Sequence, residues 1–283
     1  MTTPGGDTPL PDPAFPEDRY PCLPYLEEEY GKRVRLGRGR LARSTVVFCG
    51  LARDVAPALP ATRARLERAG ALCADYRVVI VENDSRDETP DLLARWRRDD
   101  DRVDVLSEEL GLPRLPAGRG RARMEQLAAC RNRYLDRIDQ RYDDADYVIV
   151  VDTDLPSGFS YQGLLSTFGY EAWHVVGSNG ILELDSESAP IFYDAWAFRR
   201  PGEDAAPPFE QTNALVLRRG EPPFPVWSSF GGLAVYAREA LRSGCRYGGD
   251  DCEHAVLHRR LRKRGYSEQY LNPSQIVRYA GHG

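Results

Sequence analysis

Lysine is almost missing from this chain of 283 residues, and long apolar runs are missing altogether. Only two of the 38 basic residues, Lys32 and Lys263, are lysines, and genome base composition explains that preference more simply than function does. No run of 18 apolar residues occurs, which excludes a membrane-spanning helix of the usual length. The polar, proline-rich N-terminus lacks the pattern of a secretory signal segment. We therefore expect a soluble cytoplasmic protein; association with a membrane surface through a partner stays open.

Zinc-ligand spacing is absent as well. The six cysteines include no C-x-x-C pair, and four of them lie within or beside apolar runs, which favours buried free thiols in a reducing compartment. The net charge is −5 and the pI is about 5.6, so the chain has no general attraction to nucleic acid or to an anionic membrane. With 42% hydrophobic residues, it is long enough to bury a large core.

The order of apolar and polar segments predicts an α/β protein. Residues 1–43 carry many prolines and glycines and then a basic stretch, KRVRLGRGRLAR, which indicates an extended N-terminal arm. Residues 44–158 alternate apolar strands (STVVFCGLARD, YRVVIVEND, RVDVLSEE, YVIVV) with helical patterns, the longest over residues 122–141. This alternation predicts parallel β-α-β units in a Rossmann-like nucleotide-binding half. Residues 159–283 contain short strands broken by prolines and glycines, then the helix EHAVLHRRLRKRGY, which indicates a mixed or antiparallel second half.

Two carboxylates end the most apolar strand. The segment YVIVVDTDLPSG places Asp152 and Asp154 directly after a buried strand, where an unpaired carboxylate is costly to desolvate. Side chains at i and i+2 of an extended chain point the same way, so both can meet one hard cation such as Mg²⁺ or Mn²⁺. Ligands of parallel α/β sheets bind beyond the carboxyl ends of the strands, and the strand ends at residues 50–54 and 82–85 are polar too. The pattern therefore predicts a metal-assisted ligand site.

With these motifs the body of the chain, from about residue 44 to its end, resembles nucleotide-sugar glycosyltransferases of the GT-A fold. In that group a D-x-D binds a divalent ion that holds the donor diphosphate, which implies Asp152 and Asp154 as metal ligands and Asp152 as a donor contact. IVENDSRDET resembles the group's second-strand motif, whose first acidic residue contacts the nucleotide base and maps onto Glu82. Arg53, at the end of the first strand, is a further donor-binding candidate. The resemblance also implies that residues 159–283 form the acceptor-binding and catalytic half.

Four segments in the same order carry a narrower resemblance to the capsule-associated mannosyltransferases of the Cap59 type. They are CRNRYL (130–135), FYDAWAFR (192–199), FGGLAVY (230–236) and DDCEH (250–254). The resemblance implies GDP-mannose as the leading donor, with a UDP-linked sugar as the other. It implies an acceptor hydroxyl on a saccharide, a lipid-linked molecule or a small molecule. That group often has Asn-Asp where this chain has Asp-Thr-Asp, which is closer to the general GT-A pattern.

An arginine interrupts the apolar stripe of the helix at residues 122–141. Arg131 falls among core-facing positions, where a guanidinium needs an anionic partner. A donor phosphate or a strand-end carboxylate would serve, and an arginine that reaches the surface along its apolar stem is the alternative. Gly231 and Gly232 are donor-binding candidates because they would let the backbone approach the donor closely; a bulge or turn explains them equally well.

Aromatic and acidic residues that suit sugar binding gather in the second half. Tyr193, Arg199 and Trp227 are acceptor-binding candidates, and Asp194 is a catalytic candidate; a packed aromatic core with a solvated Asp194 is the alternative.

The segment before the closing helix bears on stereochemistry. In many inverting relatives an acidic pair there supplies the general base, and here it falls on Glu253 and His254, with Asp251 nearby. Acids at a helix start also serve as caps. Because the usual aspartate is missing, and because the Cap59-type resemblance points the same way, we expect a retaining α-glycosyl transfer. GT-A enzymes often supply a C-terminal histidine as a metal ligand, which implies His282; a histidine in a frayed tail is the alternative.

Three other functions fit parts of the pattern. A haloacid-dehalogenase-type phosphohydrolase also carries D-x-D, but on its first strand, and it needs a later lysine that is absent between Asp154 and Asp250. A sugar nucleotidyltransferase needs a glycine-rich basic loop after the first strand, and GLARDVAP is a poor match. A non-catalytic nucleotide-sugar-binding module that kept the fold would lack donor hydrolysis with Mn²⁺.

Overall fold

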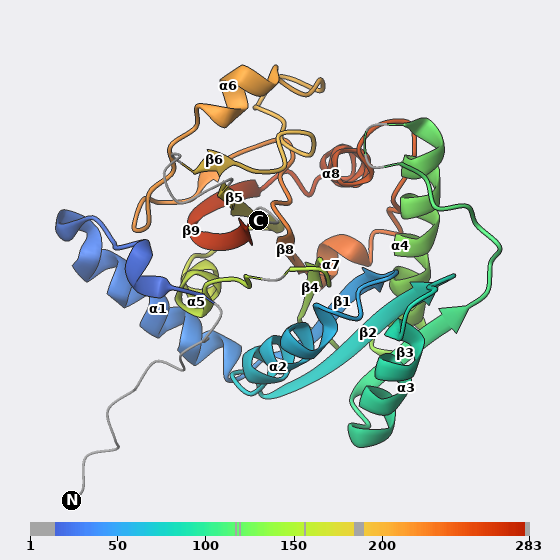
Figure 1. Ribbon diagram of the computed structural model, residues 1–283. Coiled ribbons are helices and arrows are strands. Elements are labelled where there is room, and N and C mark those ends of the chain that lie inside the picture. Colours follow the sequence, from blue (N-terminus) through green and yellow to red (C-terminus); the bar gives the residue numbers. More distant parts are fainter. Residues whose placement is uncertain (1–14, 117, 119, 156, 184–189, 281–283) are drawn as a thin grey trace, which may run out of the picture.

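One mixed sheet runs through the computed structural model, which describes residues 15–116, 118, 120–155, 157–183 and 190–280. Within these residues nine strands form the sheet, in the order β3-β2-β1-β4-β8-β5-β9-β7, and β6 pairs with β5 (Figure 1). The strands are β1 (Thr45–Ala52), β2 (Asp75–Asn83), β3 (Val103–Glu108), β4 (Tyr147–Val151), β5 (Val175–Glu183), β6 (Ile191–Phe192), β7 (Phe224–Pro225), β8 (Leu233–Ala237) and β9 (Gln269–Ala280).

Helices cover both faces of this sheet (Figure 1). The helices are α1 (Glu27–Leu41), α2 (Leu59–Gly70), α3 (Thr89–Asp99), α4 (Arg121–Arg141), α5 (Tyr161–Phe168), α6 (Phe209–Asn213), α7 (Arg238–Leu241) and α8 (Glu253–Lys263). The apolar sides of α1, α2, α3 and α5 pack on one face, and those of α4, α7 and α8 pack on the other. None of the described helices is long and apolar enough to span a bilayer.

The first half is parallel, as the alternation of strands and helices predicts. β1 pairs in parallel with β2 and β4, and β2 pairs in parallel with β3. Residues Val46, Val47, Phe48 and Cys49 of β1 have no exposed surface because both faces of the strand are covered. This arrangement brings the carboxyl ends of β1, β2 and β4 to one edge of the sheet.

The second half is mixed, as predicted. β8 is antiparallel to both β4 and β5, and β9 is parallel to β5. The expected strand PIFYDAWAFR forms only the two residues of β6, because the chain turns at Asp194, whose φ is +70°. The sequence analysis did not predict α5 or the 12-residue strand β9, which contains an N-P-S segment. The register of β9 against β5 shifts between Ser178 and Asn179, which accommodates this segment.

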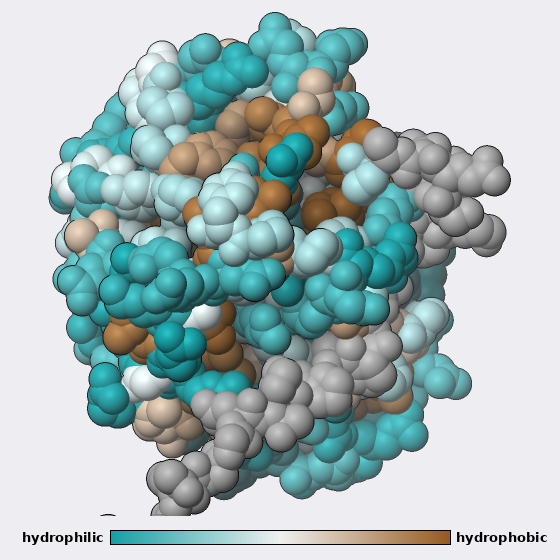
Figure 2. Space-filling model, turned by 90° about the vertical axis from the view of Figure 1, so that its left-hand side faces the viewer, coloured by the Kyte–Doolittle hydropathy of each residue, from teal (hydrophilic) through white to brown (hydrophobic). Residues whose placement is uncertain are grey.

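The expectation of an extended arm is wrong for the basic stretch. KRVRLGRGRLAR lies mainly in α1, which packs against α5. A Cβ at Gly37 would overlap the carbonyl oxygen of Leu165, so this glycine permits the close approach of the two helices. On the side of the molecule where α1 lies, the surface is mostly hydrophilic, with separate apolar areas (Figure 2). Residues 1–14 of the predicted arm lie outside the described residues.

Candidate functional site

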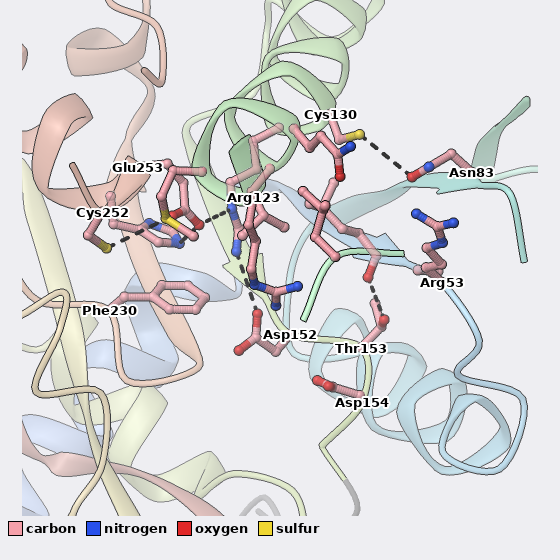
Figure 3. A pocket seen from close by; sticks show the side chains of 18 of the residues that line it. Arg53, Asn83, Arg123, Cys130, Asp152, Thr153, Asp154, Phe230, Cys252 and Glu253 are labelled. Atoms are coloured by element: carbon pink, nitrogen blue, oxygen red, sulfur yellow. Dashed lines mark hydrogen bonds and ion pairs between the residues drawn. The ribbon is translucent and has the colours of Figure 1, made fainter. Parts of the chain in front are cut away.

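A pocket of about 520 Å³ lies at the carboxyl ends of β1, β2 and β4, in the size range of small-molecule sites (Figure 3). The amino-terminal half of α4, the segment after β6 and the start of α8 complete it. Its polar and aromatic lining includes Arg53, Asn83, Arg114, Arg123, Arg131, Asp152, Asp154, Tyr193, Asp194, Phe230, Glu253 and His254.

The Asp-Thr-Asp segment turns its two carboxylates into this pocket (Figure 3). Thr153 points into the protein instead: its hydroxyl donates to the carbonyl oxygen of Leu51 at 2.6 Å, and its own carbonyl oxygen accepts from the Thr62 hydroxyl at 2.8 Å. Thr153 is therefore an anchor that fixes Asp152 and Asp154 on the pocket side.

Asp152 is held by a hydrogen bond and an ion pair from distant segments. The Tyr279 hydroxyl on β9 donates to its Oδ2 at 3.1 Å, and Arg131 Nη2 lies 3.7 Å from its Oδ1. Burial and the neighbouring charge of Asp154 raise the pKa of Asp152 to about 7, although Arg131 acts in the opposite direction. Two carboxylates crowded in this way are a setting that a cation stabilises.

The anionic partner that a core-facing Arg131 requires is Glu253, whose Oε1 accepts from Arg131 Nε at 2.9 Å. Both side chains are 6% exposed, so the pair is nearly free of solvent. The guanidinium also lies over the rings of Phe230 and Tyr247, at 5.3 and 5.8 Å from the ring centroids. Arg131 thus links the start of α8 to Asp152, and a strand-end carboxylate is among its neighbours, as the sequence reading allowed.

Asp194 enters the pocket from a strained backbone conformation. Its φ of +70° is rare for a residue with a side chain, and both carboxylate oxygens are engaged: Oδ2 accepts from the Gly231 N–H at 2.9 Å and Oδ1 from the Ala197 N–H at 3.3 Å. Burial raises the pKa of Asp194 to about 6, although the Gly231 hydrogen bond acts against this shift. The adjacent Tyr193 lines the pocket and stacks on Tyr279, with ring centroids 3.7 Å apart.

The two glycines after Phe230 make close contacts inside the protein. Gly231 and Gly232 have φ values of +64° and +86°, so glycine is favoured at both positions. A Cβ at Gly231 would meet the carbonyl oxygen of Ser178 on β5, and one at Gly232 would overlap the Tyr279 hydroxyl. Of the two readings of this pair, the geometry favours the turn over an approach to the donor.

His254 lies at the inner wall of the pocket, where its ring stacks on Phe230 at 3.8 Å. Burial and the nearby Arg131 hold the pKa of His254 well below its usual range, so the imidazole is neutral. Its Nδ1 lies 3.4 Å from the Tyr236 hydroxyl. A buried imidazole whose pKa is held this low is a weak base, and it is therefore a poor match for the general-base role considered from the sequence.

Three predicted site residues are elsewhere. Arg199 is 2% exposed and donates to Asp251 Oδ2 at 2.7 Å and to the carbonyl oxygen of Asp204, also at 2.7 Å. Neither Arg199 nor Asp251 lines the pocket, because their charges meet each other instead. Trp227 lies outside the pocket as well, and the guanidinium of Arg262 covers its ring at 4.5 Å. The geometry therefore does not support a binding or catalytic role for these residues in this pocket.

Glu82 does not line the pocket either, although its neighbour Asn83 does. Glu82 is 2% exposed and accepts hydrogen bonds from the Ser85 N–H, at 3.0 Å, and from the Ser107 hydroxyl. Its carboxylate is therefore used to hold the loop after β2, and Asn83 is the side chain that this strand offers to a ligand. Successive side chains of a strand face opposite ways, which explains why Asn83 lines the pocket and Glu82 does not.

Three further arginines, Arg53, Arg114 and Arg123, line the pocket besides Arg131, and the sequence analysis anticipated only Arg53 of these three. Arg53 Nη2 donates to the carbonyl oxygen of Leu112 at 2.8 Å, and Arg114 Nη1 lies 3.0 Å from Asp54 Oδ2. Arg123 extends from the first turn of α4 toward Asp152 in Figure 3. The run RGRARM that contains Arg123 signals positive charge, but only the fold reveals which arginine faces the pocket.

Asp152 and Asp154 fit a divalent ion of the Mg²⁺ or Mn²⁺ type. Such ions are held by one or two carboxylates together with phosphate oxygens of a substrate, and the crowding that raises the pKa of Asp152 is the kind that a cation offsets. Within the described part of the chain, no three His, Cys, Asp or Glu side chains form a metal-binding cluster. The third predicted ligand, His282, lies outside the described residues.

Comparisons with known proteins agree with this geometry. Residues 66–271 match the family described as Cryptococcal mannosyltransferase 1, of the CAP59 type. No curated protein matches the sequence significantly.

Two solved structures share the fold. The mannosyltransferase PcManGT of Pyrobaculum calidifontis, solved with GDP-Man and Mn²⁺, is 16% identical with a TM-score of 0.51, over 90% of this chain and 66% of that one. Residues 1–349 of TarS of S. aureus, solved with UDP-GlcNAc, are 10% identical with a TM-score of 0.51, over 84% of this chain and 59% of that one. This chain thus spans about two thirds or less of the length of each. The chain has the GT-A fold and belongs to the CAP59-type family of glycosyltransferases.

Proposed function

We propose that this protein is a metal-dependent glycosyltransferase that moves a sugar from a nucleotide-sugar donor to a hydroxyl of an acceptor, with retention of the anomeric configuration. One observation carries this proposal: Asp152 and Asp154 share a pocket with Arg53, Arg114 and Arg123. Paired carboxylates facing arginines suit a ligand that brings both a diphosphate and its counterion.

The donor would bind with its diphosphate on the arginine side of the pocket. Arg53 and Arg123 would bind phosphate oxygens, and Asn83, which also lines the pocket, would contact the nucleoside. Among candidate donors we favour GDP-mannose, because the family is one of mannosyltransferases and the Pyrobaculum protein of the same fold was solved with GDP-Man. A UDP-linked sugar is the second candidate, since TarS was solved with UDP-GlcNAc.

Asp152 and Asp154 would hold Mn²⁺ or Mg²⁺, whose charge offsets the negative charge of the leaving diphosphate. Arg131 acts on the same region indirectly. It draws Asp152 and Glu253 together and keeps a fixed positive charge behind the carboxylates. Because Glu253 already pairs with Arg131, its carboxylate is not available to take a proton from the acceptor.

The state of the candidate bases supports retention. An inverting transfer needs a free base that deprotonates the acceptor on the face opposite the leaving group. Glu253 is paired with Arg131, Asp251 is paired with Arg199 outside the pocket, and the buried His254 is a weak base because its pKa lies well below the usual range. In a retaining transfer the departing diphosphate takes the acceptor proton. Asp194 then has the role of a fixed negative charge near the positive charge that develops at the anomeric carbon.

The acceptor would approach along the open side of the pocket near Tyr193, whose ring offers an apolar face to a sugar. A saccharide, a lipid-linked molecule and a small molecule all present such a hydroxyl.

A donor panel tests the proposal. The protein is incubated with GDP-mannose, GDP-glucose, UDP-glucose and UDP-GlcNAc, each with Mn²⁺ and with EDTA, and released nucleotide is measured with and without simple mannosides. We expect Mn²⁺-dependent release from one donor, accelerated by an acceptor, and a rise in the melting temperature with that donor. No release and no thermal shift with any nucleotide sugar would contradict the proposed function.

A further inference from the structure

The hydroxyl of Tyr279 reaches Asp152 from the carboxyl end of β9. It donates a hydrogen bond to Asp152 Oδ2 at 3.1 Å, while Arg131 Nη2 lies 3.7 Å from the other oxygen, Oδ1. Each oxygen of the Asp152 carboxylate therefore has one positioning neighbour. Rotation of the carboxylate about its Cβ–Cγ bond would break the hydrogen bond to Tyr279.

The position of this hydroxyl is itself fixed. The Tyr279 ring stacks on the ring of Tyr193, with centroids 3.7 Å apart and planes at 32°. Gly232, at the start of β8, leaves the space that the hydroxyl occupies, because a Cβ there would overlap it. Gly232 also contacts Asp152 directly, since its carbonyl oxygen accepts from the Asp152 N–H at 2.9 Å. The end of β4, the end of β9 and the residue before β8 thus meet at Asp152.

We propose that Tyr279 is a positioning residue that orients the Asp152 carboxylate toward the divalent ion and the donor diphosphate. The inference rests on the proposed function of the pocket and adds a residue to it that sequence reading did not single out. Hydrogen bonds from neighbouring groups to metal-binding side chains fix their orientation, and loss of such a bond weakens metal affinity or activity by about 10- to 100-fold. The Tyr279 hydroxyl makes such a hydrogen bond, and its ring packs on Tyr193. Tyr279 therefore acts through Asp152 and not by contact with the reacting atoms.

The variant Tyr279→Phe tests this role because it removes the hydroxyl and keeps the ring that stacks on Tyr193. Mn²⁺ binding is measured by electron paramagnetic resonance of free Mn²⁺, with the full chain and saturating GDP. We expect the Kd for Mn²⁺ to rise by about 10-fold or more, with an unchanged melting temperature in the absence of metal. Tyr270→Phe is the matched control. It lies on the same strand, and its hydroxyl donates to Glu268 Oε2 at 2.7 Å, far from the pocket; its Mn²⁺ affinity should equal that of the wild type.

A second pair of variants moves the hydroxyl without removing it. Gly232→Ala would place a methyl group on the Tyr279 hydroxyl, whereas Gly202→Ala adds a methyl group at a similar φ, +90° against +86°, with no atom within 4 Å. Both substitutions strain the backbone in a similar way, and only Gly232→Ala also displaces the Tyr279 hydroxyl. Gly232→Ala should therefore weaken Mn²⁺ binding more than Gly202→Ala does.

The outcomes separate the inference from the proposed function. Weakened Mn²⁺ binding in Tyr279→Phe and Gly232→Ala, with both controls unaffected, supports the inference. Wild-type Mn²⁺ affinity in Tyr279→Phe overturns it and leaves the proposed function standing. A wild-type protein that binds neither Mn²⁺ nor GDP would overturn the proposed function itself, and the role of Tyr279 with it.

Discussion

Arg131 Nε and Glu253 Oε1 lie 2.9 Å apart in an ion pair whose side chains are each 6% exposed. The pair joins the middle of α4 to the first residue of α8. When one partner of a buried ion pair is removed, the other is left as an uncompensated charge, and this costs more than the pair contributed. The two residues are therefore expected to act as a unit in both stability and donor binding.

Arg131→Leu should lower the free energy of unfolding by about 3–5 kcal/mol, because Glu253 then stays buried without a partner. The double variant Arg131→Leu/Glu253→Leu should recover part of that loss. Arg121→Leu is the control, since Arg121 pairs with Glu125 at 2.8 Å on the same helix but with an 80% exposed side chain; its effect should be small. Urea unfolding measures all three, and an equal loss for Arg121→Leu and Arg131→Leu would contradict the argument.

Asp154→Ala should lower the transfer rate by about 100-fold or more, because the leaving diphosphate loses its counterion. The side chain of Asp154 is exposed, so the melting temperature should change little. Asp101→Ala, at another exposed acidic position, should retain full activity. Full activity of the wild type in EDTA would be incompatible with this prediction.

The first-formed product should have the same anomeric configuration as the donor. Proton NMR of the product during the first turnovers distinguishes an α-linked from a β-linked sugar before any secondary reaction. A product of opposite configuration would mean that a base acts on the acceptor, and Glu253 and His254 would be the residues to replace first.

Two glycines of α1 should respond to alanine in opposite directions. Gly37→Ala should destabilise the protein, because the added methyl group would overlap the carbonyl oxygen of Leu165 and push α1 away from α5. At Gly39 the nearest atom is Arg43 Nη1, 3.8 Å away, so Gly39→Ala should stabilise by up to about 1 kcal/mol through helix propensity. Thermal unfolding compares the two, and changes of the same sign would show that α1 does not pack as described.

Acid should destabilise the protein partly through His258. Burial and the neighbouring Arg262 and Arg199 lower the pKa of His258 to about 3, whereas the unfolded chain has a value of about 6.5. Between these values the unfolded state binds a proton that the folded state does not. The group's contribution to stability is therefore complete above about pH 6.5 and falls by up to about 1.4 kcal/mol per pH unit as the pH decreases toward 3. His258→Gln should flatten the pH dependence of the urea midpoint between pH 5 and 7; an unchanged slope would rule out this source.

The parts of the site that follow a local pattern were predictable. Asp152 and Asp154 stand at the end of an apolar strand, and their i, i+2 spacing sets their common direction. Arg131 stands out because a charge interrupts the stripe of α4, and that anomaly identified a residue with a buried anionic partner. The helix at residues 121–141 and the parallel order of the first half follow from periodicity alone.

The predicted site residues that do not line the pocket are held by contacts that no local sequence pattern encodes. Glu82 is acidic at the expected strand end, but the Ser107 hydroxyl of the next strand and the Ser85 N–H satisfy its carboxylate. Arg199 looked available for a ligand until the fold brought Asp251 to it. The glycines of α1 favoured a segment without helical structure. Gly37 is nevertheless part of α1, and it lets this helix pack closely against Leu165 of α5, which lies 128 residues away in sequence.

The position of β9 has a consequence for the order in which the molecule forms during synthesis. β9 is the last of the described strands in sequence, yet it lies between β5 and β7 and carries Tyr279 to Asp152. At a ribosome speed of about 5–20 residues per second, β5 waits on the order of ten seconds for its parallel partner after it has emerged. Throughout that interval the edge of β5 that later pairs with β9 exposes unpaired N–H and C=O groups. The carboxylate of Asp152, which follows β4, also lacks its hydrogen bond from the Tyr279 hydroxyl. The pocket therefore matures only after β9 has been synthesised.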